Sequence, residues 1–370
     1  MDAALLKAKI DDEQIGQDAH ARLEHPVLDA SHYYRQVATD PYFAVLTHLR
    51  HHVRAISDAY FSNVVGAKNV DLFLMTSSVS SPAGPGSDSE PIPLTFGGFD
   101  TYLVDSSQFG FEPVLIGGVP RAYCYLASMR GEDPDKRHLN QFYHCEYEAQ
   151  ETFEVAQAVA EGYVRSLASL IKEMTHTVEK LSQDPKKSRE ALDVLLATKL
   201  FQQITFDEAE ALLLKHGYTE GIRESVHGKD LTSAGERELL KILGTKAPVW
   251  VTHYHRDRVP FYQKPAADNS ERVINGDLLF PSIIENAFGG EVLGMGQRQD
   301  SVEEMYESMR RQGIDPNPYE WYVDLRRISN YKTTSGFGLG IERFISWVLG
   351  FDNISKAILY PRMKGTQMHP

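Results

Sequence analysis

Apolar side chains recur at three- and four-residue steps over several long stretches of the chain, a spacing that is typical of amphipathic helices. The first stretch lies within 41–62, and a longer one covers 150–182. Shorter stretches cover 187–199, 206–216 and 234–243. The pattern therefore predicts one helix early in the chain and a helical region in its middle.

Short runs rich in Tyr, Val, Phe and Leu predict β-strands on both sides of the helical region. Three of them, at 100–104, 122–129 and 141–148, precede it. Two more, PVWVTHY at 248–254 and YEWYVDLRR at 319–327, follow it. Strands that stop for a helical insertion and then resume favour an α+β fold, with an antiparallel sheet whose hairpins are separated by helices.

The remaining segments set the domain organisation. Residues 336–360 alternate in pattern, so a strand, a helix and a further strand are expected there. Residues 1–40 are polar with weak periodicity and are interpreted as an arm, which leaves 41–370 as one domain. Within it, 180–245 is interpreted as a helical insertion, and the Ser-, Pro- and Gly-rich stretch 77–98 as a mobile loop.

Composition and charge narrow the class of protein. With 42% hydrophobic and 24% charged residues and no long apolar run, the chain is expected to be soluble and without a membrane partner. The acidic amino terminus does not resemble a secretory signal, so we expect a cytoplasmic protein. Cys124 and Cys145 are too few for a disulfide scaffold or a four-thiolate zinc site. A net charge of −13 argues against DNA as a partner and weakens the case for tRNA without ruling it out.

The stretch GFGLGIERFISWVLG at 336–350 has the first pattern that indicates chemistry. Its alternating glycines, Gly336, Gly338 and Gly340, share one face of a strand and leave a flat floor that a planar base can approach. The strand leads into a helix whose first turn holds Arg343, a side chain suited to phosphate oxygens. A packing role for the glycines is the alternative explanation.

The stretch from Ala127 to Gln150 is the second such pattern. Arg130 and Glu132 share a strand face, and DPDK forms a turn, so the stretch is interpreted as a hairpin. The face of the returning strand holds an aromatic ring, a histidine and two carboxylates: Phe142, His144, Glu146 and Glu148. That face could stack a base and bind cations or amines, and a solvated charged hairpin is the alternative.

Together these stretches resemble the class II aminoacyl-tRNA synthetases. The hairpin is similar to their motif 2 and GFGLGIERF to their motif 3. Other stretches resemble the asparaginyl and aspartyl branch: TYLVDSSQFGFEP, FQQITFDEAEALL, GKDLTSAGERELL, PVWVTHYHRDRVPFYQKP, EVLGMGQR, YEWYVDLRR and ILYPR. The resemblance spans roughly Phe43 to Arg362. It implies an antiparallel sheet flanked by helices, with the helical insertion between motif 2 and motif 3.

By this resemblance ATP is a substrate, bound in a bent form. Arg130 would hold its α-phosphate, Arg343 its γ-phosphate, and Phe142 would stack on adenine. Arg137 and His138 would contact the outer phosphates. Glu132 and the glycine floor at Gly338 and Gly340 would complete the ATP site. Fixed cations can stabilise the charge on the α-phosphorus, and because the attacking carboxylate is already ionised no general base is required.

The resemblance also implies Mg²⁺ and a small amino-acid substrate. Glu291 and Asp277 would bind the metal, but their spacing is longer than the family's, so Glu285 competes for that role and a turn or cap role for Asp277 stays open. Ser107 and Gln108 match residues that contact the substrate in the family. Arg326 matches the arginine that reads the side-chain oxygen of Asp or Asn. The alternative for Ser107 and Gln108 is ordinary hydrogen bonding within a strand. The alternative for Arg326 is a surface ion pair.

Three departures from the family shape the expected function. Only about 40 residues precede the core, so we expect no anticodon-binding barrel. The loop 77–98 lacks the family's Glu-Gly-Gly or Glu-Gly-Ala, and NYKTTSGFG replaces its Pro-His-Gly-Gly. The leading interpretation is a tRNA-independent ligase similar to archaeal asparagine synthetase, which adenylates aspartate, asparagine or an analogue and transfers it to ammonia or an amine. A truncated asparaginyl-tRNA ligase and a non-catalytic sensor are the alternatives, and a homodimer is expected.

Overall fold

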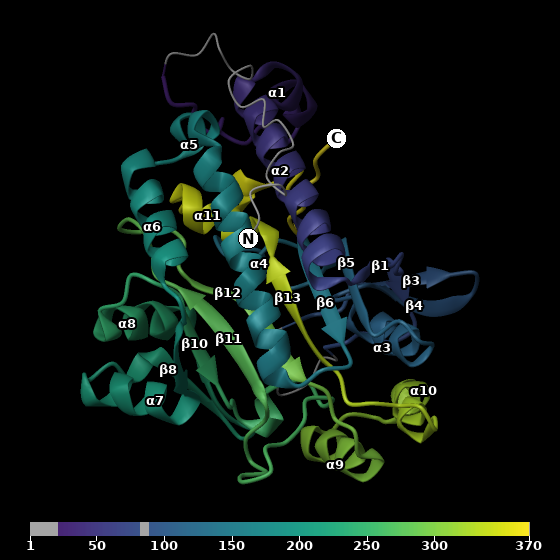
Figure 1. The fold of residues 1–370 in the computed structure, drawn as a ribbon. Coiled ribbons are helices and arrows are strands. Elements are labelled where there is room, and N and C mark those ends of the chain that lie inside the picture. The colour runs from purple at the N-terminus through teal and green to yellow at the C-terminus, as the bar shows by residue number, and fades with distance from the viewer. Residues whose placement is uncertain (1–20, 82–88, 370) are drawn as a thin grey trace.

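A large mixed sheet organises the molecule (Figure 1). The computed structural model describes residues 21–81 and 89–369. Over these residues the strand order is β1-β5-β6-β13-β12-β11-β10-β7. Neighbours from β5 to β10 are antiparallel, and the edge strands β1 and β7 pair in parallel. The strands are β1 (Lys68–Asn69), β5 (Arg121–Met129), β6 (Gln141–Ala149), β7 (Gln202–Thr205), β10 (Val249–Thr252), β11 (Asn275–Phe280), β12 (Gly290–Gln297) and β13 (Ser335–Gly340). The predicted α+β class and the predicted β5–β6 hairpin are confirmed.

Two long helices, α2 (Pro41–Ala59) and α4 (Phe153–Glu173), lie side by side against one face of the sheet (Figure 1). This face is apolar because alternate strand residues point toward the helices. Tyr147 of β6 and Phe337 of β13 belong to the main core there, in contact with Phe61. The other residues of these strands must therefore face the opposite side, where the polar site lies.

The region between β6 and β10 is largely helical, as predicted. It contains α5 (Thr175–Leu181), α6 (Pro185–Ala197), α7 (Phe206–Lys215), the hairpin β8 (Ile222–Ser225) and β9 (Gly228–Leu231), and α8 (Ser233–Leu243). The helix predicted over 150–182 is interrupted at Met174, which separates α4 from α5. Polar caps set two boundaries: Thr205 and Glu208 form a capping box at α7, and Thr232 caps α8.

A small sheet flanks the main one near β1. It is formed by β2 (Met75–Thr76), β4 (Phe99–Leu103) and β3 (Pro93–Phe96), and α3 (Gln108–Ile116) follows it. The predicted strand at 100–104 thus exists as β4. The predicted loop 77–98 contains β3, and its residues 82–88 lie outside the described part of the chain, as do residues 1–20 of the predicted arm. The rest of that arm includes the short helix α1 (Tyr33–Thr39).

The strand predicted at 319–327 is wrong. Residues Glu320–Asp324 form the helix α10, between the 3-10 turns Asn317–Tyr319 and Leu325–Arg327. Tyr322 and Val323 are buried, and the ring of Tyr322 lies 4.2 Å from that of Phe109. A short run of apolar residues can be buried in an irregular helical segment as easily as in a strand. Such a run therefore does not distinguish the two conformations.

The carboxyl end also differs from its prediction. The strand β13 and the helix α11 (Ile341–Leu349) are present, but the last strand is replaced by the 3-10 turn Ile354–Ala357 and a single bridge between Arg362 and Gln141. No helix in the described residues has the length and apolar character needed to span a bilayer.

Candidate active site

Two cavities open on the polar face of the sheet and share a wall. The tighter one, of about 80 Å³, lies between the β5–β6 loop and the start of α11. The wider one, of about 280 Å³, lies over β11, β12 and β13. Arg130, His144, Glu291 and Gly338 line both. A molecule bound in one cavity can therefore meet a molecule bound in the other at these four residues.

Arg130 and Arg343 both line the tight cavity, although 213 positions separate them in the chain. The guanidinium of Arg130 lies 5.2 Å from the ring centre of Phe142, and its buried Nε has no hydrogen-bond partner among the described residues. Arg343 donates from Nη1 to Glu291 Oε2 at 3.0 Å. The structure thus brings the two predicted phosphate-binding arginines to one cavity, with donor capacity left on Arg130.

The floor of the tight cavity contains Phe142, Gly338 and Gly340, as the sequence suggested. The ring of Phe142 meets that of His144 edge-on at 4.8 Å. A Cβ on Gly338 would have no neighbour closer than 3.6 Å, which is ordinary van der Waals contact, so glycine is not needed there to relieve a clash. Gly336 differs from the predicted floor, since a Cβ there would collide with the carboxylate of Glu148.

Three residues of the β5–β6 loop line the same cavity. Arg137 is held by the carbonyl of Gly289 and, at 2.9 Å, by Glu236 Oε2 of α8. His138 contacts Asp135 Oδ1 at 2.8 Å, and burial together with the charges of Arg343 and Arg137 lowers the pKa of its imidazole. Glu132 is positioned differently, because it accepts from the backbone N–H of Glu90 at 3.2 Å and so anchors the segment after residue 88.

Asp277 and Glu291 converge where their strands pair. A Cβ on Gly294 would lie 3.3 Å from Asp277 Oδ1 and 3.4 Å from Glu291 Oε1, so both carboxylates lie over this glycine. An irregular register between Leu278 and Leu279 brings the two acids together. Glu285, the competing candidate, is exposed in a separate groove and lines neither cavity.

The pKa values of the two acids are shifted in opposite directions. Burial and the charge of Glu291 raise the pKa of Asp277 well above its ordinary value. Burial opposes ionisation of Glu291, but the charge and hydrogen bond of Arg343 hold its pKa below the ordinary value. Like charges at close range cannot both ionise without a counter-charge, so the pair is suited to a divalent cation.

Mg²⁺ fits this pair only with help from a substrate. No group of three or more carboxylate, histidine or cysteine side chains converges to hold a metal among residues 21–81 and 89–369. Mg²⁺ commonly uses one or two carboxylates together with phosphate oxygens and water. Glu291 at the wall shared by the two cavities and Asp277 in the wide cavity match that donor set.

The wide cavity has one wall from the start of α3 and the segment before it. Gln108 lines it, with Nε2 unpartnered among the described residues. Ser107 does not line it, but its backbone N–H donates to Glu146 Oε2 at 2.9 Å. Its neighbour Ser106 lines the cavity and donates to the other oxygen of Glu146. Burial raises the pKa of Glu146, although these hydrogen bonds oppose the rise.

Arg326 lies outside both cavities, contrary to its predicted place in the substrate pocket. Its Nη1 lies 2.8 Å from Glu112 Oε2, both side chains are 0% exposed, and Nε donates to the carbonyl of Gln299 at 2.9 Å. A guanidinium with its donors used inside the protein cannot reach a ligand without breaking these contacts. The surface ion pair considered as the alternative is also wrong, since the pair is fully buried.

Arg298 lines the wide cavity beside Gln108, and sequence reasoning missed it. It donates to Glu148 Oε1 from Nε at 3.0 Å and to Glu148 Oε2 from Nη2 at 2.8 Å. It also donates to Gln108 Oε1. The only sequence signal was its place at the end of the strand stretch EVLGMGQR, two positions after Gly296.

The helical insertion contributes a residue to the wide cavity. Asp230 of β9 lines it and accepts from Arg258 Nη2 at 3.1 Å. Arg258 belongs to the 3-10 turn Arg256–Arg258 and is 7% exposed. The cavity wall is therefore formed from the insertion as well as from the sheet.

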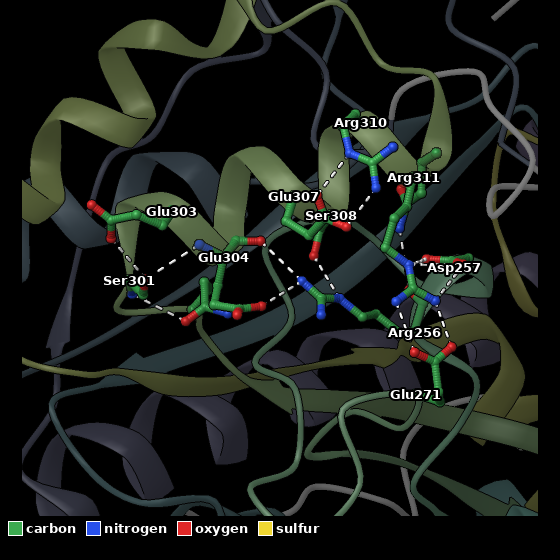
Figure 2. Close-up of polar contacts among 12 residues, drawn as sticks. Arg256, Asp257, Glu271, Ser301, Glu303, Glu304, Glu307, Ser308, Arg310 and Arg311 are labelled. Carbon is green, nitrogen blue, oxygen red and sulfur yellow. Dashed lines mark hydrogen bonds and ion pairs between the residues drawn. The ribbon is translucent and has the colours of Figure 1, made fainter.

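A set of ion pairs holds that 3-10 turn against α9 (Val302–Gln312), as Figure 2 shows. Arg256 donates to Glu304 Oε2 at 2.7 Å, and Arg311 donates from Nε to Asp257 Oδ1 at 2.8 Å. Arg311 also reaches Glu271 at 2.8 Å. Because these pairs form a network with a bidentate arginine, they restrain the turn more than isolated surface pairs would.

Comparison with known proteins gives the same fold and the same family. The family model for tRNA synthetases class II (D, K and N) matches residues 83–364. A probable cytoplasmic asparagine–tRNA ligase of Encephalitozoon cuniculi is 33% identical over 273 residues, which are 73% of this chain and 57% of that protein. The asparagine–tRNA ligase of Thermococcus gammatolerans is 31% identical over 265 residues, 70% of this chain and 57% of that protein.

Among solved structures, asparaginyl-tRNA synthetase of Pyrococcus horikoshii complexed with asparaginyl-adenylate superposes with a TM-score of 0.80 at 25% identity, covering 94% of this chain and 74% of that one. The Entamoeba histolytica asparaginyl-tRNA synthetase, at 23% identity and a TM-score of 0.75, shares the fold. The chain thus spans just over half the length of the curated relatives that it matches. With its antiparallel sheet, its two convergent arginines and a family model matched over most of its length, the chain belongs to the class II tRNA synthetases of the D, K and N group.

Proposed function

We propose that this protein uses ATP to adenylate the carboxyl group of a small amino acid. The observation that supports this most is the pair of joined cavities, with Arg130 at their shared wall and Arg343 in the tight one. ATP would occupy the tight cavity, stacked on Phe142, and the amino acid would occupy the wide one. The α-phosphate would then lie at the junction, beside Arg130 and Glu291.

The proposed reaction needs charge stabilisation rather than proton transfer. A carboxylate oxygen of the amino acid attacks the α-phosphorus, the bond to the oxygen that bridges to the β-phosphate breaks, and pyrophosphate leaves. Arg130 stabilises the negative charge that develops at the α-phosphate, and Arg343 holds the outer phosphates. Mg²⁺, held by Asp277 and Glu291, would neutralise phosphate charge when bound.

We propose asparagine, aspartate or a close analogue as the substrate. Arg298 lines the wide cavity as a donor suited to the oxygen of a side-chain amide, while Glu148, which is 0% exposed and lines neither cavity, neutralises its charge. Because Glu148 already neutralises Arg298, an added side-chain carboxylate would meet no uncompensated cation there. The pair therefore favours an amide over an acid.

We further propose that the activated acyl group is transferred to a small acceptor. A small acceptor such as ammonia or an amine is supported by the altered approach to β13, where NYKTTSG replaces the family's sequence, and by the net charge of −13, which opposes binding of a polyanion. Transfer to tRNA is the second candidate, and the names of the relatives from Encephalitozoon cuniculi and Thermococcus gammatolerans support it.

Assembly and location complete the proposal. We propose a homodimer, because oligomers of identical chains most often pair by twofold symmetry and because the family resemblance implies it. We propose the cytoplasm as its compartment, in line with the name of the Encephalitozoon cuniculi relative. Sedimentation of the purified protein across a concentration series tests the first statement directly.

Exchange of labelled pyrophosphate into ATP, measured across a panel of amino acids, tests the proposed activation. Asparagine or aspartate should support exchange, and no exchange with any amino acid would overturn the proposal. The amino acid that works is then offered with ammonium, with small amines and with tRNA. Amide formation without tRNA supports the small acceptor, whereas charging of tRNA alone replaces it with the second candidate.

A further inference from the structure

Glu236 is a carboxylate that the helical insertion, rather than the sheet, brings to the edge of the tight cavity. It lies in the first turn of α8, and 13% of its side-chain surface is exposed. The proposed chemistry gives it no task, since it lines neither cavity. Its contacts nevertheless connect it to two residues that do.

Both contacts of Glu236 use the same oxygen. Oε2 accepts from Arg137 Nη2 at 2.9 Å and from the backbone N–H of Glu291 at 3.0 Å. A Cβ on Gly290 would collide with this oxygen, so the carboxylate fits closely against the start of β12. One carboxylate thereby joins the β5–β6 loop to the strand that contains Glu291.

These contacts determine how Arg137 faces the cavity. Nη1 is used by the carbonyl of Gly289 and Nη2 by Glu236, whereas the buried Nε has no partner among the described residues. The ring of Phe288 lies 5.1 Å below the guanidinium and limits its tilt. An arginine held at two nitrogens and stacked on a ring loses little further side-chain entropy when its remaining N–H meets a phosphate.

We propose that Glu236 is a positioning residue for ATP, which acts by holding Arg137 and the backbone of Glu291 at the edge of the nucleotide cavity. This inference rests on the proposed function and gives the helical insertion a part in it. Glu236 of α8 holds these groups in place before ATP binds. The affinity for ATP therefore depends on α8, although no residue of α8 contacts ATP.

The test compares Glu236→Gln with Glu238→Gln. The first replacement removes the charge that pairs with Arg137 and leaves a neutral, weaker amide oxygen for the two donors. Glu238, two positions later on α8, pairs with Lys241 away from the cavities. We expect calorimetric titration with ATP to show binding about 10- to 100-fold weaker for Glu236→Gln and unchanged for Glu238→Gln. The KM for ATP should rise by the same factor, and the KM for the amino acid should not change.

A double-mutant cycle with Arg137→Ala shows whether Glu236 acts through Arg137. The double variant, Glu236→Gln with Arg137→Ala, should bind ATP about as tightly as whichever single variant has the lower ATP affinity, because both changes remove the same contact. Additive losses, or wild-type ATP affinity in Glu236→Gln, would overturn the inference. If thermal unfolding shows that Glu236→Gln does not fold, Glu236→Asp, which keeps the charge but is too short to reach both donors, carries the same expectations.

The inference and the proposed function fail separately. A wild-type protein that binds ATP but exchanges no pyrophosphate would overturn the proposed function, and calorimetry on the variants would still decide the role of Glu236. A wild-type protein with full exchange and a Glu236→Gln variant with unchanged ATP affinity would overturn the inference alone.

Discussion

At the scale of single residues, the site is dominated by charged side chains whose partners come from elsewhere in the sheet. Arg343 is paired with Glu291, and Arg298 with Glu148, whereas the guanidinium Nε of Arg130 is unpartnered among the described residues. This difference suggests distinct tasks: the paired arginines are oriented in advance, and Arg130 has the most donor capacity to offer a ligand.

Replacing either phosphate-binding arginine should abolish activation. We expect Arg130→Ala and Arg343→Ala each to reduce pyrophosphate exchange by about 100-fold or more, because each removes a fixed cation from the developing phosphate charge. Far-ultraviolet circular dichroism should remain that of the wild type. Exchange at the wild-type rate in either folded variant would contradict the assignment of both arginines to ATP.

Glu148→Gln should shift the substrate preference toward aspartate. Without the buried Glu148 carboxylate, the Arg298 cation at the cavity wall is free to pair with a side-chain carboxylate. We expect the ratio of kcat/KM for aspartate to that for asparagine to rise by about 10- to 100-fold. An unchanged ratio in a folded variant would show that Arg298 does not read the side chain.

Asp277→Asn should stabilise the metal-free protein, increasingly so as the pH rises. The pKa of Asp277 is raised in the folded state, so its contribution to stability is present below the ordinary value near 3.8 and is lost as the pH rises through the raised value. Melting temperatures in a chelator between pH 5 and 8 should therefore diverge, with the variant higher.

The exposed Glu285 provides the control for that measurement. Glu285→Gln should leave the melting temperature unchanged at every pH, because the side chain lies away from the acidic pair. Parallel pH curves for wild type and Asp277→Asn would be inconsistent with a shifted titration. Asp277→Asn should also raise the Mg²⁺ concentration that half-maximal exchange requires.

At the scale of elements, β13 shows how one sequence pattern serves two purposes. The three alternating glycines were predicted to form a common floor, but only Gly338 and Gly340 line the tight cavity. Gly336 instead makes room for the carboxylate of Glu148 and the carbonyl of Tyr147 on the adjacent strand. The alternation in the sequence indicated that the glycines share one face of the strand. The residues of the neighbouring strand determine which groups pack against each glycine.

Alanine at two of these positions should separate stability from binding. Gly336→Ala should lower the free energy of unfolding by about 1–3 kcal/mol, because its Cβ would overlap atoms of β6. Gly338→Ala should change stability little, since its nearest neighbour would be 3.6 Å away, but its methyl group would occupy the cavity floor and weaken ATP binding. Denaturant titration and calorimetry of both variants check this, and equal stability losses would contradict it.

At the scale of the whole molecule, a buried ion pair joins regions far apart in the chain. Glu112 of α3 and Arg326 lie 214 positions apart and are 0% exposed. Such a pair links the flank around α3 to the segment after α10. Its two charges are already out of water, so loss of either one leaves the other buried and unpaired.

Glu112→Gln should therefore lower the free energy of unfolding by about 3–5 kcal/mol. The neighbouring surface pair of Arg327 and Asp324 supplies the control, and Arg327→Gln should leave the free energy of unfolding nearly unchanged. Urea unfolding measures both. A fully stable Glu112→Gln variant that loses pyrophosphate exchange would mean that Arg326 serves the substrate, as its sequence context suggested.

Local patterns by themselves determined much of this protein. Helical spacing located α2, α7 and α8, and the runs of large apolar residues located β5 and β6, because these periods depend on the geometry of each element alone. The ordered motifs also indicated the two arginines that meet in the tight cavity, Arg130 and Arg343. Short apolar runs were less informative, and 319–327 proved helical because burial against Phe109, not the run itself, chose its conformation.

Tertiary structure decided which of two arginines faces the wide cavity. Arg298 and Arg326 each come at the end of a stretch rich in apolar residues, EVLGMGQR and YEWYVDLRR, and nothing local distinguishes their roles. Their difference comes from carboxylates 150 and 214 positions away, one of which leaves Arg298 at the cavity while the other holds Arg326 in the interior. The role of a charged side chain depends on the residue that it pairs with. Residues distant in the chain come into contact only when the sheet and helices pack, so the sequence alone does not identify the pair.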